Sequence, residues 1–169
     1  MNTKEYKVGG KIYKLPAVYY TNNGYVSVTK VNGNNIRVYI PTEETTKIVG
    51  IEAIDKANII RTEQPLDLKN GDVYTITSPQ KNGKLQFTVV SVNENDLQLK
   101  VLRNGKTDVT GEFSVVDFSA FIKMLEQTDG FNVVSERKIN TTSGNIKKWI
   151  IGGIVLLVAG GIYFGLKKK

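Results

Sequence analysis

An apolar segment near the end of this 169-residue chain limits what the rest of the chain can be. Residues 149–166 form 18 consecutive positions without a charged side chain. As a helix rising about 1.5 Å per residue they would extend about 27 Å, close to the hydrocarbon thickness of a bilayer. We therefore predict a transmembrane helix over 149–166, followed by a basic tail over 167–169.

The residues that flank this segment support the same prediction. Lysines can extend their charged ends to the lipid headgroups, and Trp and Tyr prefer the interface between headgroups and hydrocarbon. A buried core helix would not be bracketed by five lysines. The segment TTSGNIKKW has no LPxTG-type motif, so we set aside a cell-wall processing signal. The predicted anchor residues are Trp149, Tyr163, Lys147, Lys148, Lys167, Lys168 and Lys169.

The start of the chain sets the expected orientation. The N-terminal stretch MNTKEYKVGGKIYKL contains lysines but no continuous apolar run, so it does not have the pattern of a secretory signal peptide. We expect a single-pass protein with a C-terminal anchor, whose soluble part lies on the cytoplasmic face of the membrane.

The predicted anchor is rich in glycine. Small residues let helix backbones approach closely in lipid, which is a main route to helix association. Glycine is also common in membrane spans without such a role, and both interpretations stay open. The candidate positions for helix–helix packing are Gly153, Gly160, Gly161 and Gly165.

The formal charge of +7 is confined to the end of the chain. Residues 137–169 contain seven of the 23 basic residues and no acidic one, while the other 136 residues hold 16 basic and 16 acidic side chains. Positive charge beside an apolar span attracts anionic lipid headgroups. We therefore expect the lipid bilayer, rather than nucleic acid, as the partner of this charge.

The chain lacks both Cys and His. Disulfides, thiolate metal sites, His-metal sites and Ser-His or Cys-His catalysis are thereby excluded. Carboxylate pairs remain, at Glu43-Glu44, at Glu52 and Asp55, and at Asp67 and Asp72. They lie in turn-like polar segments, so we expect solvated surface groups. We predict no enzyme activity, no catalytic residue, no metal site and no cofactor.

Two stretches have a strand-and-turn pattern. Short runs rich in Val, Ile, Leu and Tyr alternate with Asn-Gly and Gly-Gly turns over residues 4–40 and again over 66–113. A shift of 61 residues aligns SVTKVNGNNIRVYI (27–40) with TVVSVNENDLQLKV (88–101) and also Gly10-x-x-Tyr13 with Gly71-x-x-Tyr74. A tandem repeat and convergent hairpin patterns both explain this.

The expected fold class is mainly β. It has two small antiparallel barrel or sandwich units of SH3-like size, one amphipathic helix and the C-terminal transmembrane helix. The units cover residues 1–61 and 62–116. Residues 41–65, between the units, could form a short helix, but Gly50 and the β-branched residues favour a mixture of turn and strand.

A helix and a short strand are expected over residues 117–135, before a polar linker over 136–148. Asp117 is the expected N-cap, and Phe118, Phe121, Ile122 and Leu125 have helical spacing. Gly130 suits the end of the helix.

The first unit is rich in tyrosine. Tyr25 and Tyr39 fall on faces opposite the apolar residues of their strands, so we expect some tyrosines to be exposed. Exposed Tyr gives a large contact area at a small entropic cost. Tyr25, Tyr39 and Arg37 are the candidate protein interface, although the tyrosines also suit the edges of a small core.

These features lead to one functional hypothesis and two alternatives. We expect a non-enzymatic, membrane-anchored structural or adaptor protein. It would link a membrane to a protein layer, as a minor membrane protein of a virion with an internal membrane. Other structural proteins, including capsid proteins, are the expected partners, within an oligomer or larger assembly. The alternatives are a cellular tail-anchored module that binds peptide, glycan or nucleic acid, and a membrane-tethered enzyme that uses carboxylates.

Overall fold

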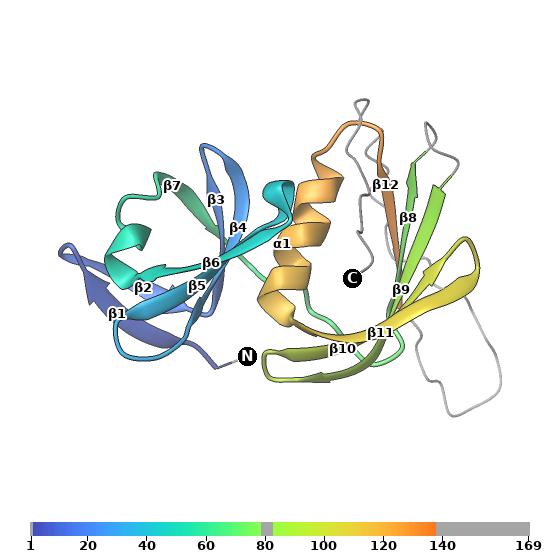
Figure 1. The fold of residues 1–169 in the computed structure, drawn as a ribbon, viewed down its shortest axis with the longest axis horizontal. Helices are drawn as coiled ribbons and strands as arrows, with labels where there is room; N and C mark the ends of the chain where they lie inside the picture. Colours follow the sequence, from blue (N-terminus) through green and yellow to red (C-terminus); the bar gives the residue numbers. More distant parts are fainter. Residues whose placement is uncertain (1, 79–82, 138–169) are drawn as a thin grey trace.

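A computed structural model describes residues 2–78 and 83–137 (Figure 1). The anchor residues and glycines predicted within 147–169 lie outside these ranges. The N-terminal half contains β1 (Lys4–Val8), β2 (Lys11–Leu15), β3 (Ala17–Thr21), β4 (Gly24–Lys30), β5 (Asn35–Ile40), η1 (Pro41–Glu43), β6 (Thr45–Gly50), η2 (Ile51–Ile54) and β7 (Ile59–Glu63). The C-terminal half contains β8 (Val73–Ser78), β9 (Gly83–Asn93), β10 (Asp96–Arg103), β11 (Lys106–Ser114), α1 (Val115–Glu126) and β12 (Asn132–Glu136).

The first half forms a five-stranded antiparallel sheet in the order β6-β5-β4-β3-β7. Its strands alternate as the sequence predicted: Ile36 is buried, whereas Arg37 lies on the opposite face. The segment 41–65 contains the expected strands, β6 and β7, but also the two short 3-10 helices η1 and η2. A separate two-stranded hairpin, β1-β2, turns at Gly9 and Gly10, which have φ of 56° and 84°. Such positive φ angles favour glycine.

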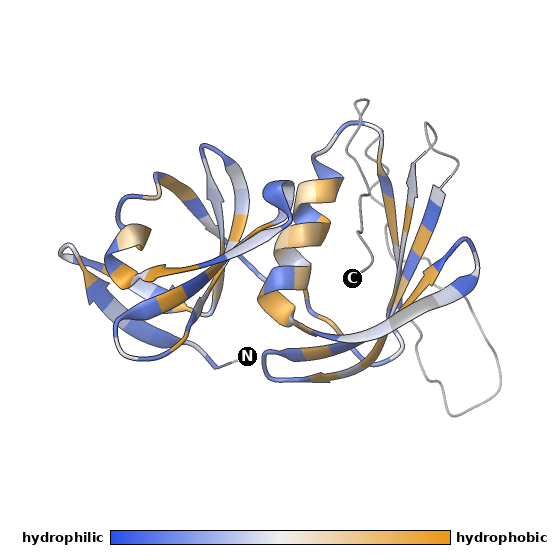
Figure 2. Ribbon diagram, in the orientation of Figure 1, coloured by the Kyte–Doolittle hydropathy of each residue, from blue (hydrophilic) through white to orange (hydrophobic). Residues whose placement is uncertain are grey.

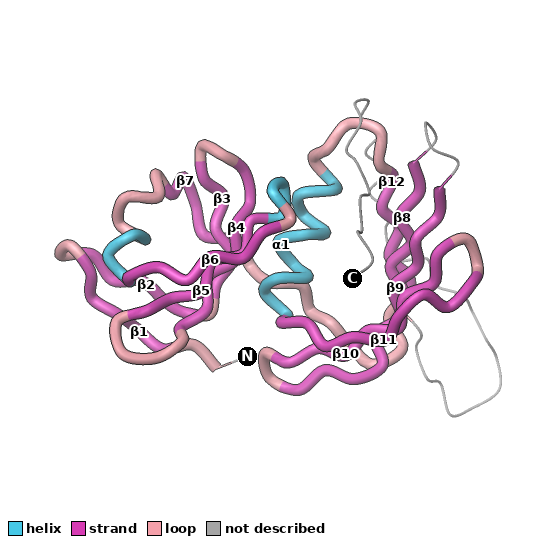
Figure 3. Tube along the Cα trace, viewed as in Figure 1, coloured by secondary structure: helices cyan, strands magenta, loops and turns pink. Residues whose placement is uncertain are grey.

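The second half forms another five-stranded antiparallel sheet, in the order β11-β10-β9-β8-β12. Here α1 lies between β11 and β12 in the sequence and covers one face of the sheet (Figure 3). The boundary predicted between residues 61 and 62 falls inside β7, and β12 joins the second sheet.

Both sheets are open, so the expectation of barrels is wrong while the mainly β class is confirmed. The outermost strands β6 and β7 do not pair with each other, nor do β11 and β12. In the second sheet the 12-residue helix α1 fills the concave side, and its width of about 10 Å keeps the edges apart. In the first sheet, η2 and the β1-β2 hairpin take the corresponding place.

Each face of the first sheet packs into a different apolar core. Figure 2 shows the apolar positions along α1 and the strands. One core lies between this sheet and the β1-β2 hairpin. It contains Leu15, Tyr19, Val28 and Ile36. The larger core lies around α1 and contains side chains from both sheets, including Val18 and Tyr25 of the first. The described layers are therefore hairpin, sheet, helix and sheet.

The two sheets share one topology, which supports the 61-residue repeat. In each, four sequential strands are followed by a helical segment and a fifth strand beside the first. The pair Val28↔Val38 recurs as Val89↔Leu99, at the predicted shift. Both helical segments also begin with the same contact: the N–H of Ile51 donates to the Asn34 carbonyl (2.7 Å), and that of Val115 to the Asn95 carbonyl (2.8 Å).

The predicted match of Tyr13 with Tyr74 does not hold. Tyr13 lies in the separate hairpin strand β2, whereas Tyr74 lies in β8 of the second sheet. Two residues separate β3 from β4, and four separate β8 from β9, so a single shift cannot align the first strands as well as the central hairpins.

Helix α1 is confirmed, but its N-cap is Ser114 rather than Asp117. The Ser114 hydroxyl accepts a hydrogen bond from the Asp117 N–H at 3.0 Å. Asp117 is instead in the first turn, where its negative charge suits the helix dipole. Phe118, Ile122 and Leu125 are buried as their spacing predicted. Gly130 has φ of 88° in the turn beyond the helix.

Candidate functional site

The residues predicted to contact another protein contact α1 of the same chain. The exposed fraction of Tyr25 is only 5%, so its expected exposure is wrong. Arg37 forms an ion pair with Asp117 of the helix at 2.6 Å, and Tyr39 is half-buried on the same face. The predicted alternation is present, but the polar face of this sheet is covered by a helix that lies far away in the sequence.

Asp117 is the centre of a polar network between the first sheet and the helix. Its side chain is 10% exposed, accepts a hydrogen bond from the Ser27 hydroxyl and pairs with Arg37. Burial, followed by the carboxylates of Asp117 and Glu44, raises the pKa of Tyr39 to about 12. Because buried polar groups need partners, this network fixes how the sheet and helix meet.

A second polar cluster lies toward the C-terminal end of α1. The Tyr25 hydroxyl accepts a hydrogen bond from Gln127 at 2.9 Å, and Arg61 stacks 4.2 Å from the Tyr20 ring centroid. Glu63 accepts from both Arg61 (2.5 Å) and Lys123 (3.3 Å). Burial alone would raise the pKa of Glu63, but these hydrogen bonds outweigh it and hold the pKa below its usual value.

The carboxylates that were expected to be solvated behave differently from one another. Asp55 accepts hydrogen bonds from Lys11 (2.9 Å) and Tyr13 (2.8 Å). Both bonds lower the pKa of Asp55, and the bond from Lys11 has the larger effect. Asp72 is buried, with an exposed fraction of 3%, so the expectation is wrong at this position. Its side chain accepts a hydrogen bond from the Lys69 N–H at 2.9 Å and also pairs with Arg137, 65 residues later, which no local pattern indicates.

Arg137 joins the end of the described chain to the loop before β8. Its guanidinium donates to the Asp67 carbonyl, and it lies 3.3 Å from Asp67 Oδ2 and 3.4 Å from Asp72 Oδ1. These groups line a cavity of about 320 Å³ together with Tyr74, Ser135 and Glu136. We call Asp67, Asp72 and Arg137 the exit clamp, since the chain continues from here toward residues 149–166.

A second cavity, of about 310 Å³, lies between the first strands and the β9-β10 turn. Lys4, Tyr6, Lys30 and Glu94 are among its lining residues. Lys30 Nζ lies 5.8 Å from the Tyr6 ring centroid. In residues 2–78 and 83–137, no group of three or more acidic side chains is arranged to hold a metal ion.

One broad sheet surface has no helix or second sheet packed against it among the described residues, although Val73 within it is only 8% exposed. It is the face of the second sheet opposite α1, which we call the outer face. Strand register arranges it in cross-strand rows. One row is Val134, Thr75, Gln86 and Leu102, and the next is Glu136, Val73, Thr88 and Lys100. These rows depend on the register of β12, which the sequence pattern does not predict.

No helix among the described residues is long and apolar enough to span a bilayer. Comparison with protein-family models, with curated proteins and with solved structures found no match.

Proposed function

We propose that the chain is a non-enzymatic adaptor that holds a two-sheet body on a membrane. The observation that carries this proposal is the uncharged run over 149–166, bracketed by five lysines. The exit clamp supports it, because it fixes the point from which the chain continues toward the predicted anchor. The polar clusters of the body also support it, because their side chains bond within the chain and hold its layers together.

The body is proposed to face the cytoplasm and to contact other structural proteins. In a virion with an internal membrane, this side of the membrane would face the capsid. We expect the protein to be present in many copies at a fixed ratio to capsid proteins. Quantitative mass spectrometry of purified particles would measure this ratio, and a ratio that varies freely between preparations would contradict the viral setting.

The anchor itself is tested in the full-length chain. Each lysine placed at the centre of a membrane helix costs about 3 kcal/mol of insertion free energy. We expect L156K/L157K to move the protein from the alkali-resistant membrane fraction to the supernatant. L156A/L157A is the matched control and should remain in the membrane. An L156K/L157K protein that still resists alkaline extraction would contradict the proposal.

One observation favours a second candidate, the tail-anchored binding module. The 310 Å³ cavity combines lysines with a tyrosine ring, which suits a polar ligand with an apolar face. Titration of the full-length protein with oligosaccharide, peptide and oligonucleotide libraries would identify such a ligand. Saturable binding that is lost in Y6A would favour the module over the structural role.

A further inference from the structure

We propose that the outer face of the second sheet is the contact between two copies of this chain. The copies would be related by a two-fold axis that runs along the strands, between β8 and β9. This inference rests on the proposed function only for the position of the anchors. The contact itself is argued from strand register and charge.

The outer face is the surface that the fold leaves available. Both faces of the first sheet are occupied, by the β1-β2 hairpin and by α1, and α1 also covers the inner face of the second sheet (Figure 1). Among residues 2–78 and 83–137, α1 is the only element outside the second sheet that makes extensive contacts with its strands, although Val73 on the outer face is only 8% exposed. Val134 and Leu102 belong to neither core cluster, as expected for side chains that point outward.

The two rows are complementary to themselves under this symmetry. The axis exchanges β12 with β10 of the second copy, and β8 with β9. In the first row, Val134 then faces Leu102 of the other copy. In the second row, the exposed Glu136 faces the exposed Lys100 of the other copy. Val134 thus meets Leu102 and Glu136 meets Lys100, while Val73 faces the Thr88 side chain of the other copy.

The neighbouring row creates no charge conflict. Thr77 pairs with Lys84 across β8 and β9, so the symmetry sets each Lys84 against Thr77 of the other copy. A different partner protein would not require this matching of a face to itself. Two sheets related in this way pack with strands roughly aligned, about 10 Å apart, which is the usual geometry of a β-sandwich.

The symmetry also places both chain exits at one end of the dimer. A two-fold axis parallel to the strands preserves strand direction, so β12 of each copy runs toward the same end, where Glu136 and Arg137 lie. Strands are about 4.8 Å apart, so three strand spacings and the sheet separation put the two exits about 17 Å apart. Two anchors could therefore enter one membrane side by side.

The contact area is small, so we expect the dimer to form on a membrane and not in dilute solution. Four strands of a few residues each cover about 400 Å² per copy, which is small for a dimer in dilute solution. Anchoring both copies in one bilayer raises their effective concentration. We therefore expect the dimer in proteoliposomes at protein densities where the same chain in excess detergent is mostly monomeric.

Cross-linking of the full-length chain tests the geometry. The natural chain has no Cys, so single cysteines can be introduced without background. We expect V134C and L102C chains, mixed in proteoliposomes, to give a heterodimer with a short bis-thiol reagent. Each variant alone should give little product, because like residues lie about 17 Å apart across the axis. Equal product from all three samples would overturn the proposed register.

Charge reversal on this cross-linking background tests the pairing. In the dimer, residue 100 of each copy faces residue 136 of the other, so either K100E or E136K alone creates two pairs of like charges. We therefore expect about tenfold less heterodimer from either variant. The double variant K100E/E136K restores opposite charges across the axis and should recover the yield. K56E, an exposed substitution in the turn after η2, is the control and should have no effect. Single reversals without effect, or a double variant without recovery, would overturn the proposal.

Vesicle flotation of the same samples separates the two hypotheses. Protein that floats with the vesicles but gives no V134C–L102C product contradicts the dimer and leaves the membrane anchor intact. Protein that fails to float contradicts the anchor. Cross-linking of that protein in solution, concentrated to match its density on vesicles, then tests the dimer alone, and absence of the product there overturns it.

Discussion

At the scale of single residues, Asp117 has more than one structural role. It lies in the first turn of α1, pairs with Arg37 and accepts a hydrogen bond from Ser27. Its position in the sequence suggested a helix cap, which Ser114 provides instead. The sequence pattern located the helix start to within three residues, but it could not show that two strands of the first sheet meet Asp117, since register across 80 or more residues has no local signal.

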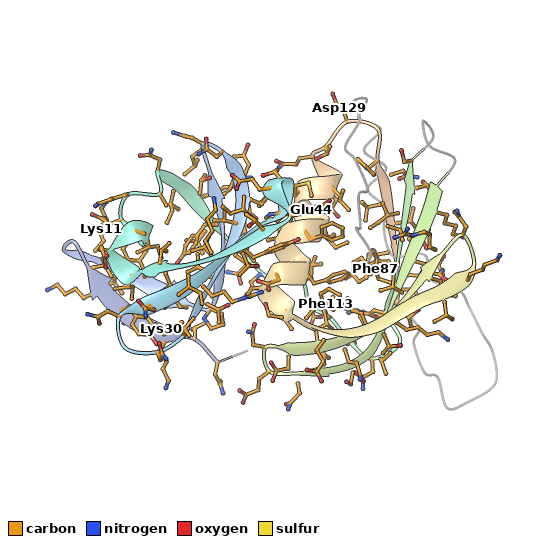
Figure 4. All side chains as sticks on the ribbon, viewed as in Figure 1. Lys11, Lys30, Glu44, Phe87, Phe113 and Asp129 are labelled. Atoms are coloured by element: carbon orange, nitrogen blue, oxygen red, sulfur yellow. The ribbon has the colours of Figure 1, made fainter. Side chains whose placement is uncertain are left out.

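The Asp117 network should contribute measurably to stability. Removing one member of a buried ion pair costs 3–5 kcal/mol, but Arg37 is 35% exposed and can regain water. We therefore expect D117N to lower the free energy of unfolding by about 2 kcal/mol. D129N, in the exposed turn after α1 (Figure 4), is the control and should change it by less than about 0.5 kcal/mol. Urea unfolding of both variants measures the difference, and equal effects would contradict the role of the network.

Glu63 gives a pH prediction. Its pKa in the folded chain lies below the unfolded value of 4.5, so the stabilisation is fully present above that pH and is lost as the pH falls through the folded pKa. We expect E63Q to reduce stability at neutral pH and to flatten the decline below pH 4.5 relative to the natural chain. Unfolding measured from pH 7 to pH 3 tests this, and parallel curves for the two proteins would contradict it.

At the scale of elements, α1 is a core for both sheets. Phe87 of β9 lies between α1 and the second sheet (Figure 4), with its ring 5.5 Å from that of Phe118. On the other side of the helix, Asp117 forms an ion pair with Arg37 of the first sheet. Sequence spacing predicted one apolar helix face. The burial of the remaining faces could not be predicted, because it depends on a sheet that ends about 50 residues earlier.

Because α1 is buried on both sides, shortening one of its buried side chains should strongly lower the free energy of unfolding. Phe118 is 2% exposed, and replacing a buried Phe with Ala costs about 4 kcal/mol. F113A removes the same group at a site that is 40% exposed and should cost less than about 1.5 kcal/mol. Denaturant midpoints of the two variants test this, and similar losses would show that α1 is not the centre of the core.

At the scale of the whole molecule, the helix that separates the sheets also joins them. The sequence predicted two small units with a helix after them, and the strand pairs within each were largely predictable from Asn-Gly and Gly-Gly turns. Open sheets around a shared helix were not predictable, because barrel closure depends on whether edge strands such as β6 and β7 meet. The shared topology of the sheets, by contrast, agrees with the 61-residue sequence alignment, for which a tandem repeat and convergent hairpins were both predicted explanations.

Sharing a helix predicts that the two halves unfold together. The larger core contains Val18 and Tyr25 of the first sheet beside Phe87 and Leu99 of the second, so neither half can lose its packing alone. We expect a single calorimetric transition for the full-length protein in detergent, and D117N should shift it without splitting it. Two resolved transitions would show that the halves are independent.

The exit clamp has a mechanical consequence. A pull on the chain beyond Arg137 acts along β12, which lies antiparallel to β8 over five residue pairs. Force applied along a strand loads all its inter-strand hydrogen bonds at once, as in shear, whereas force across a strand breaks them one after another. Arg137 holds the chain against Asp67 and Asp72, and so keeps the load aligned with the strand. A body tethered in this way to the proposed anchor would resist detachment under tension.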